Sequence, residues 1–114
     1  MCNRLYAKPS LTRKPFFVMS HGQGGCDGSN VFSAVGFYTG ATFPADYAGS
    51  FFFGDVVRGC MWTMFAGPNG DPDPATLFTF GSGIYPVDVK TGSNGDLFYV
   101  DIYGGSIHEV MFSG

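Results

Sequence analysis

The chain has 114 residues, of which 18% are aromatic and only 13% are charged, and 18 are glycines. This composition is typical of one small all-β domain with aromatic strands and tight turns, and it excludes a disordered or coiled-coil chain. The net charge is −3, and no stretch is apolar over the roughly 18 residues of a membrane span, so we expect neither a nucleic-acid partner nor a transmembrane helix.

Residues 1–14 contain four of the six basic residues, no acidic residue and no hydrophobic periodicity. We interpret them as an irregular basic leader, more typical of a solvated tail than of a polyanion site. The leader lacks the apolar run of a secretory signal peptide. A short strand is predicted over residues 16–20. The glycine-rich loop that follows, 21–30, lacks the residue order of a phosphate-binding loop.

Seven more strands are predicted from runs rich in Phe, Tyr, Val and Ile, which favour the half-buried surface of a sheet. Segments rich in Gly, Pro, Asn and Asp separate these runs and predict turns. A glycine inside the first run, Gly36, indicates that another backbone approaches closely there. No helix is predicted. The expected strands cover residues 31–38, 50–55, 60–65, 76–80, 87–91, 97–101 and 106–112.

Two of the predicted hairpins are similar, namely 49–65 (GSFFFGDVVRGCMWTMF) and 95–112 (GDLFYVDIYGGSIHEVMF). A repeat of about 40–50 residues built from strands is typical of β-propeller blades. The alternative is two unrelated hairpins that look alike. Because an aspartate ends the same strand in both copies, we interpret the pair as turn-closing residues. Three anchors share one offset of 46 residues: Gly49 with Gly95, Asp55 with Asp101, and Gly59 with Gly105.

Several phrases occur in a characteristic order: FYTG, P-A-D-Y-x-G, F-F-G-D-x-x-R-G and P-V-D-x-x-x-G-x-x-G-D-L-F-Y-V-D. Together they make roughly residues 15–112 resemble the C-terminal blades of glucose/sorbosone dehydrogenases. These are soluble aldose sugar dehydrogenases that depend on pyrroloquinoline quinone (PQQ). The family forms a six-bladed propeller with PQQ and calcium on one face of the ring. It oxidises the anomeric carbon of aldoses, with a histidine as general base.

The resemblance implies a blade register. Residues 16–20 would be the outermost strand of a preceding blade, 31–80 one complete blade and 87–112 a partial one. The expected fold class is therefore all-β, with about two four-stranded antiparallel blades of a β-propeller, incomplete in this chain, over residues 15–114. Alternate turns of an antiparallel meander lie at the same end. The loops at 21–30, 57–60 and 81–86 should therefore share the face that holds the cofactor in the family.

The resemblance makes Arg58, Tyr85 and Asp88 the candidate cofactor-binding residues. Arg58 and Asp88 match an arginine and an aspartate of the family. Where members of the family carry a lysine and two arginines, this chain has Val57, Tyr85 and Val87. PQQ is a tricarboxylate that cations normally neutralise, so these departures predict weak PQQ binding by this chain. The same face is expected to collect His21, Asp27, Asp101 and Tyr103.

Two functions remain open. The first is a fragment or divergent relative of a PQQ-dependent sugar dehydrogenase, which oxidises a sugar only within a complete propeller. The second is a non-catalytic propeller piece that acts by self-assembly or by ligand binding. No catalytic residue is assigned, because the family's histidine lies in an earlier blade and a loop histidine such as His21 is more often structural. The resemblance implies an extracellular or periplasmic location.

Assembly could use further blades from another chain or a second copy of this one. Residues 16–20 of one copy have the length and apolar character to pair with the open edge of 106–112 in another. Such a contact is head-to-tail, so it forms either a ring or a filament. Three copies would complete a six-bladed ring.

The chain has three cysteines, Cys2, Cys26 and Cys60, and no C-x-x-C spacing, so we expect no zinc site. An odd count fits either one bridge with a spare thiol or three free thiols. The register implied by the resemblance puts Cys26 and Cys60 in loops at one end. We therefore expect these two to be paired if the protein is exported, and Cys2 to be free.

Overall fold

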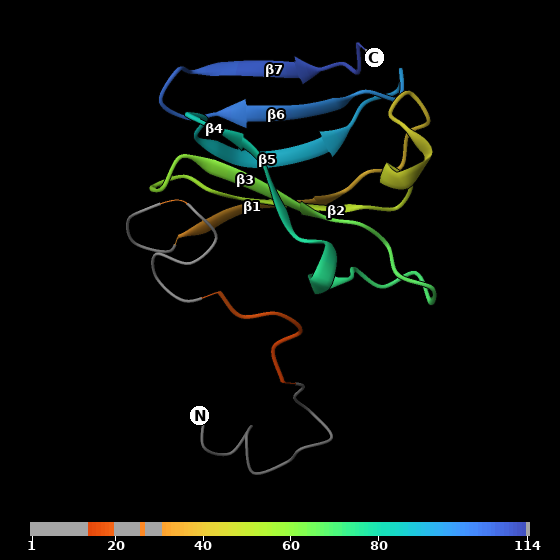
Figure 1. The fold of residues 1–114 in the computed structure, drawn as a ribbon. Helices are drawn as coiled ribbons and strands as arrows, with labels where there is room; N and C mark the ends of the chain where they lie inside the picture. The colour runs from red at the N-terminus through yellow and green to blue at the C-terminus, as the bar shows by residue number, and fades with distance from the viewer. Residues whose placement is uncertain (1–13, 20–25, 27–30, 114) are drawn as a thin grey trace, which may run out of the picture.

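A computed structural model describes residues 14–19, 26 and 31–113 of the chain, which form two antiparallel sheets and no α-helix (Figure 1). Single-turn 3-10 helices η2 (Ala45–Tyr47) and η3 (Pro74–Thr76) lie in two of the connections. The first sheet has the order β1 (Phe32–Phe37), β2 (Phe51–Asp55), β3 (Cys60–Met64) and β4 (Phe78–Ser82). The second sheet has the order β5 (Pro86–Thr91), β6 (Leu97–Asp101) and β7 (Ser106–Val110).

The all-β prediction is confirmed, and so are the seven strands predicted between residues 31 and 112, each with bounds within two residues. In both sheets every strand pairs with the next one along the chain, as in a meander. β4 begins later than predicted because Pro74–Thr76 forms η3. The Ala75 N–H donates to the Asp73 side chain there, so the chain turns before it becomes extended.

The strand predicted over residues 16–20 does not form in the part of the chain that the structure describes. Residues 14–19 contain no strand, and Ser20 lies outside the described residues, as does the predicted leader apart from Lys14. A strand needs a neighbour that completes its backbone hydrogen bonds. This segment instead packs its side chains on the first sheet, with Phe17 6.0 Å from Phe53 between ring centroids.

The predicted repeat is present in three dimensions. The offset of 46 residues converts β2 into β6 and β3 into β7, and a four-residue turn joins each pair. The anchor glycines all have positive φ angles, a conformation that glycine adopts at little cost. These angles are 74° at Gly49, 88° at Gly95, 71° at Gly59 and 61° at Gly105.

The inner strands β1 and β5 repeat as well, but with an offset of 54 residues. Both carry a bulge at the same place, between Phe32 and Ala34 in β1 and between Pro86 and Asp88 in β5. The offset differs because the β1–β2 connection is eight residues longer than the β5–β6 connection. β1, β2 and β3 of the first sheet therefore correspond to β5, β6 and β7, while β4 has no counterpart among the strands of the second sheet.

The main core lies between the two sheets. It combines side chains of the first sheet, of the second sheet and of the β1–β2 connection. At Gly36 a Cβ atom would overlap the carbonyl oxygen of Val89, which is the close backbone approach predicted for this glycine. The buried members are Ala34, Tyr38, Phe43, Phe52, Met61, Val89, Leu97 and Tyr99.

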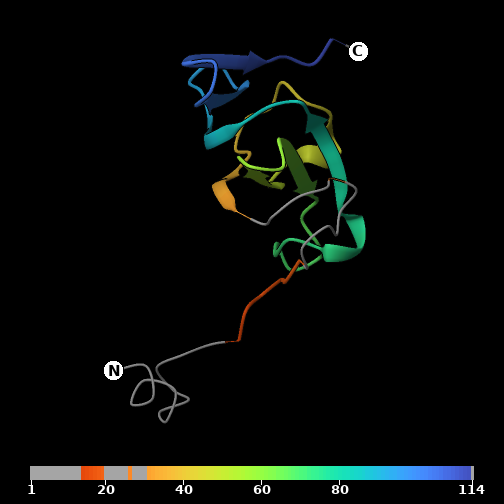
Figure 2. The same ribbon diagram turned by 90° about the vertical axis from the view of Figure 1, so that its left-hand side faces the viewer.

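The two sheets approach each other along β1 and β5 and diverge toward their last strands. In both views β5 lies next to the first sheet, and β7 lies farthest from it (Figures 1 and 2). The long β1–β2 connection helps to fill the wedge between the sheets. Its Phe43 stacks on Tyr38 at 4.7 Å, and its Tyr47 meets Phe52 and Phe80 at 6.3 Å between ring centroids.

A second apolar cluster covers part of the outer face of the first sheet, over β2 and β3, on the side that points away from the second sheet. It contains Met19, Cys26, Phe53, Cys60, Trp62 and Met64. Because apolar groups cover both faces, all five residues of β3 are buried. A disulfide joins Cys26 to Cys60, with their Cα atoms 6.6 Å apart, so the predicted pairing is confirmed. Cys2 lies outside the described residues.

Candidate functional site

The turns that were predicted to share one end of the molecule do meet there. The Ile84 N–H donates to the Gly59 carbonyl at 3.2 Å, and the Ile102 N–H donates to the Tyr85 carbonyl at 3.1 Å. The β2–β3 turn, the β4–β5 connection and the β6–β7 turn therefore form one surface, which we name the turn end (left in Figure 1). Of the loop 21–30 only Cys26 is described, and it joins this end through its disulfide.

Asp55 fastens the turn end of the first sheet. Its Oδ1 accepts hydrogen bonds from the N–H groups of Val57 and Arg58, both at 2.9 Å, and its Oδ2 accepts one from Val31 at 2.7 Å. The carboxylate therefore ties the hairpin turn to the residue that precedes the inner strand β1.

Asp101 does the same in the second sheet. Its Oδ1 accepts from the Gly104 N–H at 2.8 Å, and its Oδ2 accepts from the Tyr85 N–H at 3.3 Å, just before β5. The Gly104 N–H is the main cause that lowers the pKa of Asp101 below its ordinary value, with further help from the N–H groups of Tyr85 and Tyr103. The turn-closing role predicted for this pair of aspartates is confirmed.

Arg58, a predicted cofactor-binding residue, is directed into the protein and is only 8% exposed. Its guanidinium donates to the Cys26 carbonyl, with Nε at 2.6 Å, and its Nη1 lies 3.5 Å from the Met19 sulfur. The same group lies over the Trp62 ring, 5.0 Å from the ring centroid. Arg58 thus holds Met19 and Cys26 against the first sheet.

The other two predicted residues are placed differently. The Tyr85 ring meets the exposed Tyr103 ring edge-on, with centroids 4.8 Å apart. Asp88 lies half-buried in β5, where its Oδ1 accepts a hydrogen bond from the Val89 N–H at 3.0 Å. The structure therefore brings together Tyr85, Tyr103 and Asp101, while Arg58 turns away from them. His21 and Asp27 lie outside the described residues.

The residue types at the turn end do not fit PQQ. Val57, Tyr85 and Val87 supply no positive charge to a tricarboxylate, and the guanidinium of Arg58 is already engaged. Within the described ranges, no group of three or more His, Cys, Asp or Glu side chains could hold a metal ion. A search of the same residues for a helix long and apolar enough to cross a membrane found none.

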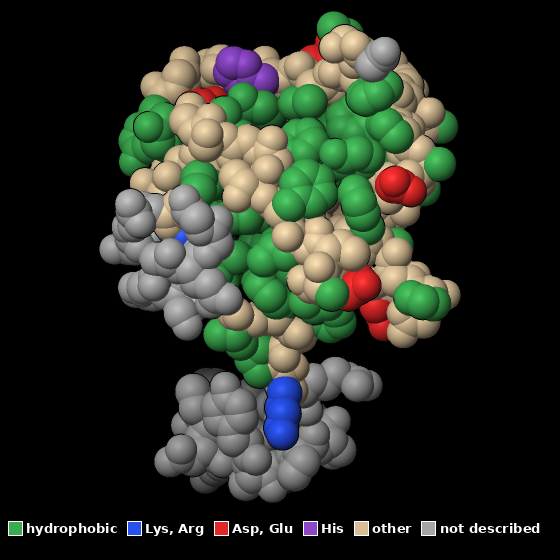
Figure 3. Space-filling view, viewed as in Figure 1, with side chains coloured by type: hydrophobic (Ala, Val, Ile, Leu, Met, Phe, Trp, Pro, Cys, Tyr) green, Lys and Arg blue, Asp and Glu red, His purple; other side chains and the backbone are tan. Residues whose placement is uncertain are grey.

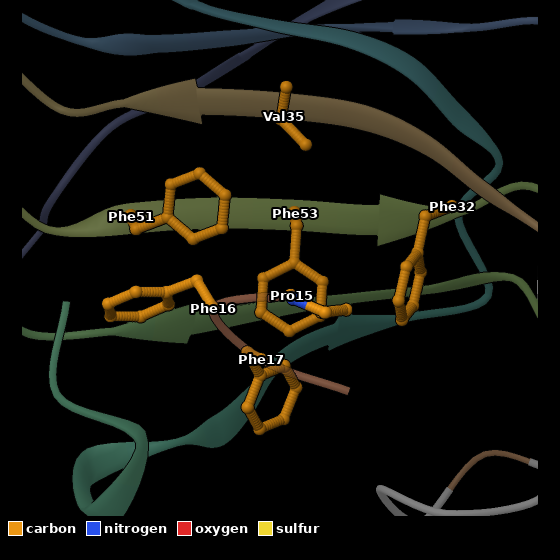
Figure 4. Close-up of a pocket in the computed structure, with 7 residues that line it drawn as sticks. All are labelled: Pro15, Phe16, Phe17, Phe32, Val35, Phe51 and Phe53. Carbon is orange, nitrogen blue, oxygen red and sulfur yellow. The ribbon is translucent and has the colours of Figure 1, made fainter. Parts of the chain in front are cut away.

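The outer face of the first sheet carries an apolar groove of about 370 Å³ that the sequence analysis did not predict (Figure 4). Val35 and Phe32 come from β1, Phe51 and Phe53 from β2, and the N-terminal segment supplies one wall. Val35 is 59% exposed in it. In the sequence, the offset of 54 residues between β1 and β5 would have aligned Val35 with Val89, two positions at which the exposure of the two sheets differs. The groove is lined by Pro15, Phe16, Phe17, Phe32, Val35, Phe51 and Phe53.

The groove contains no charged lining residue, so it is suited to an apolar protein surface rather than to a sugar or a carboxylate. Exposed hydrophobic side chains are also frequent elsewhere. Figure 3 shows them over much of the described part of the chain, with acidic side chains scattered among them. Examples outside the groove are Phe37, Val57, Ile107 and Met111.

Comparison with known proteins adds no identification. No family profile, no curated protein and no solved structure matches the chain.

Proposed function

We propose that this chain forms two neighbouring blades of a β-propeller and acts by joining further blades, without carrying out chemistry of its own. The repeat carries this proposal. Two sheets of the same plan, with the same bulge, turn and closing aspartate, pack on each other along their inner strands and diverge outward. Blades in a propeller are arranged in this way around a central axis.

The open groove supports action by assembly. A repeat array cannot bury all its faces when it has only two units. The groove lies on the face of the first sheet that points away from the second sheet, where a further blade would be added. Self-association through residues 16–20 and the edge of β7 is another form of assembly, and it stays a prediction because it joins two chains.

A second candidate function is that of a divergent relative of the PQQ-dependent sugar dehydrogenases. The ordered phrases favour it, as does the cluster of Tyr85, Tyr103 and Asp101 at the end that faces the cofactor in that family. In that case, the cations for PQQ, the calcium ligands and the general base would come from other blades. The chain would oxidise a sugar only within a complete ring.

A dye-reduction assay separates the two candidates. The purified chain is mixed with glucose, PQQ and calcium, and PQQ binding is followed by absorbance. We expect no dye reduction above a blank without protein, because the described residues supply neither the cations nor a base. Sugar-dependent reduction by the chain alone that is lost in His21→Ala would overturn the proposal and establish the second candidate.

The disulfide supports an extracellular or periplasmic location as part of this proposal. Disulfides form and persist in oxidising compartments and are rare in the cytosol of most organisms. Cys26 and Cys60 lie at the turn end, where the bridge fastens the N-terminal segment to β3.

A further inference from the structure

The internal repeat identifies the counterparts of the groove residues in the second sheet. Val35 corresponds to Val89 by the offset of the inner strands, and Phe51 corresponds to Leu97 by the offset of the hairpins. Val89 is 1% exposed, because it packs against the first sheet, whereas Val35 is 59% exposed. Val35 and Val89 therefore occupy equivalent positions in the two sheets, but only Val89 is covered by a neighbouring sheet.

We propose that the groove is a docking site for one further β-sheet, whose contacting face resembles the inner face of the first sheet and is not supplied by a second copy of this chain. The inference rests on the proposed function, and it adds the chemistry of the partner. The contacting face of the partner sheet carries small apolar side chains, and its inner strand has a glycine opposite Val35.

The interface inside the chain shows why glycine is needed. At Gly36 the carbonyl oxygen of Val89 takes the place that a Cβ atom would fill, and at Gly54 the ring of Pro86 does so. Two inner strands can approach this closely only if one of them lacks side chains at the contact. A sheet that docks on Val35 and Phe32, the counterparts of Val89 and Pro86, needs the same clearance.

The outer face of the second sheet does not meet this requirement. The repeat replaces Ala34 by Asp88, Gly36 by Lys90, Gly54 by Val100 and Thr63 by Glu109. The Lys90 side chain would fill the clearance that glycine leaves. Docking this face on the groove would also bury three charged groups against Phe and Val side chains that offer them no partner. One copy of the chain therefore does not stack on another.

A gain-of-function variant tests this proposal with the chain itself as the probe. The quadruple substitution Asp88→Ala, Lys90→Gly, Val100→Gly and Glu109→Thr gives the second sheet an outer face like the inner face of the first. Each copy can then dock on the groove of the next. We expect the molar mass measured by light scattering at least to double relative to the unmodified chain.

Two added substitutions control for the site of docking. Val35→Asp places a charge in the groove, so adding it to the quadruple variant should restore the mass of the unmodified chain. Val57→Asp places the same charge on the exposed β2–β3 turn, outside the lining of the groove, and should leave the mass raised. Circular dichroism of each variant reports whether the sheets are retained. If the quadruple variant does not fold, Val35→Asp in the unmodified chain is the second measurement, and it should leave the mass unchanged because the unmodified chain does not dock on its own groove.

Two results would overturn the proposal. The first is a folded variant that keeps the mass of the unmodified chain at every concentration tested. The second is an unmodified chain that already self-associates, with Val35→Asp alone dissociating it, since the groove would then take a second copy. Neither result bears on the dye-reduction assay, so failure of this inference is distinct from failure of the proposed function.

Discussion

Asp55 and Asp101 show what a single carboxylate does at the same place in two sheets. One oxygen accepts N–H groups of the hairpin turn, and the other accepts the N–H just before the inner strand. Hydrogen bonds of this kind favour the ionised carboxylate, and they lower the pKa of Asp101. The Asp101 carboxylate therefore stabilises the fold above the pKa it has in the unfolded chain, about 3.9, and this contribution is lost as the pH falls through the lower folded value.

We predict that Asp101→Asn lowers the thermal midpoint at neutral pH and that the difference from the unmodified chain narrows below about pH 4. The reason is that protonation removes the same charge from the unmodified chain at low pH. Thermal melts followed by circular dichroism at several pH values measure this. Asp46→Asn, at an exposed aspartate in η2, is the matched control and should change the midpoint little. A difference in thermal midpoint between Asp101→Asn and the unmodified chain that stays constant down to pH 3 would contradict the prediction.

At the residue scale, the sequence predicted the contacts of the two aspartates but not the contacts of Arg58. The aspartates recur at one repeat position, and repetition indicates a structural role. The position of Arg58 depends on Met19, Cys26 and Trp62, and the first two lie more than 30 residues away in the chain. No local pattern reveals such partners, so the sequence does not predict that the Arg58 side chain is buried among them.

The strands were predictable because apolar and aromatic runs alternate with turns that require Gly, Asn or Asp. The described part of the predicted strand 16–20, residues 16–19, is also rich in apolar side chains but forms no strand, because composition alone does not supply a neighbouring strand. The groove escaped prediction for a different reason. Its counterpart in the second sheet is shifted by the longer β1–β2 connection, so the offset of 46 residues does not align Val35 with Val89.

The packing of β1 against β5 can be tested at Gly36. We predict that Gly36→Ala destabilises the chain by about 1–3 kcal/mol, because its Cβ would overlap the Val89 carbonyl and force β1 and β5 apart. Urea unfolding followed by Trp62 fluorescence measures the change, since this residue is the single tryptophan of the chain.

The matched control is Gly81→Ala in β4. A Cβ atom at this position would meet the Ile84 side chain at 3.4 Å, which is ordinary contact, and its φ angle is not positive. This substitution should change the free energy of unfolding by less than about 0.5 kcal/mol. Equal losses at the two glycines would show that the close approach of β1 and β5 is not what makes Gly36→Ala costly.

At the scale of the whole molecule, the first sheet is the common support of two apolar clusters. One cluster joins it to the second sheet, and the other joins it to Met19 and Cys26. These two residues are remote in sequence from the first sheet and lie in no strand. The Cys26–Cys60 disulfide and the hydrogen bonds from Arg58 to Cys26 therefore keep the second cluster packed on the first sheet.

We predict that replacing both Cys26 and Cys60 by serine lowers the free energy of unfolding by about 3–4 kcal/mol, as expected for a bridge whose ends lie 34 residues apart. The bridge limits the unfolded chain, and its loss also frees the segment that forms one wall of the groove. Denaturant unfolding without reductant gives the measurement. Cys2→Ser is the control and should unfold like the unmodified chain, because Cys2 is expected to be free. A comparable loss in Cys2→Ser, or none in the double variant, would show that this bridge does not stabilise the protein in solution.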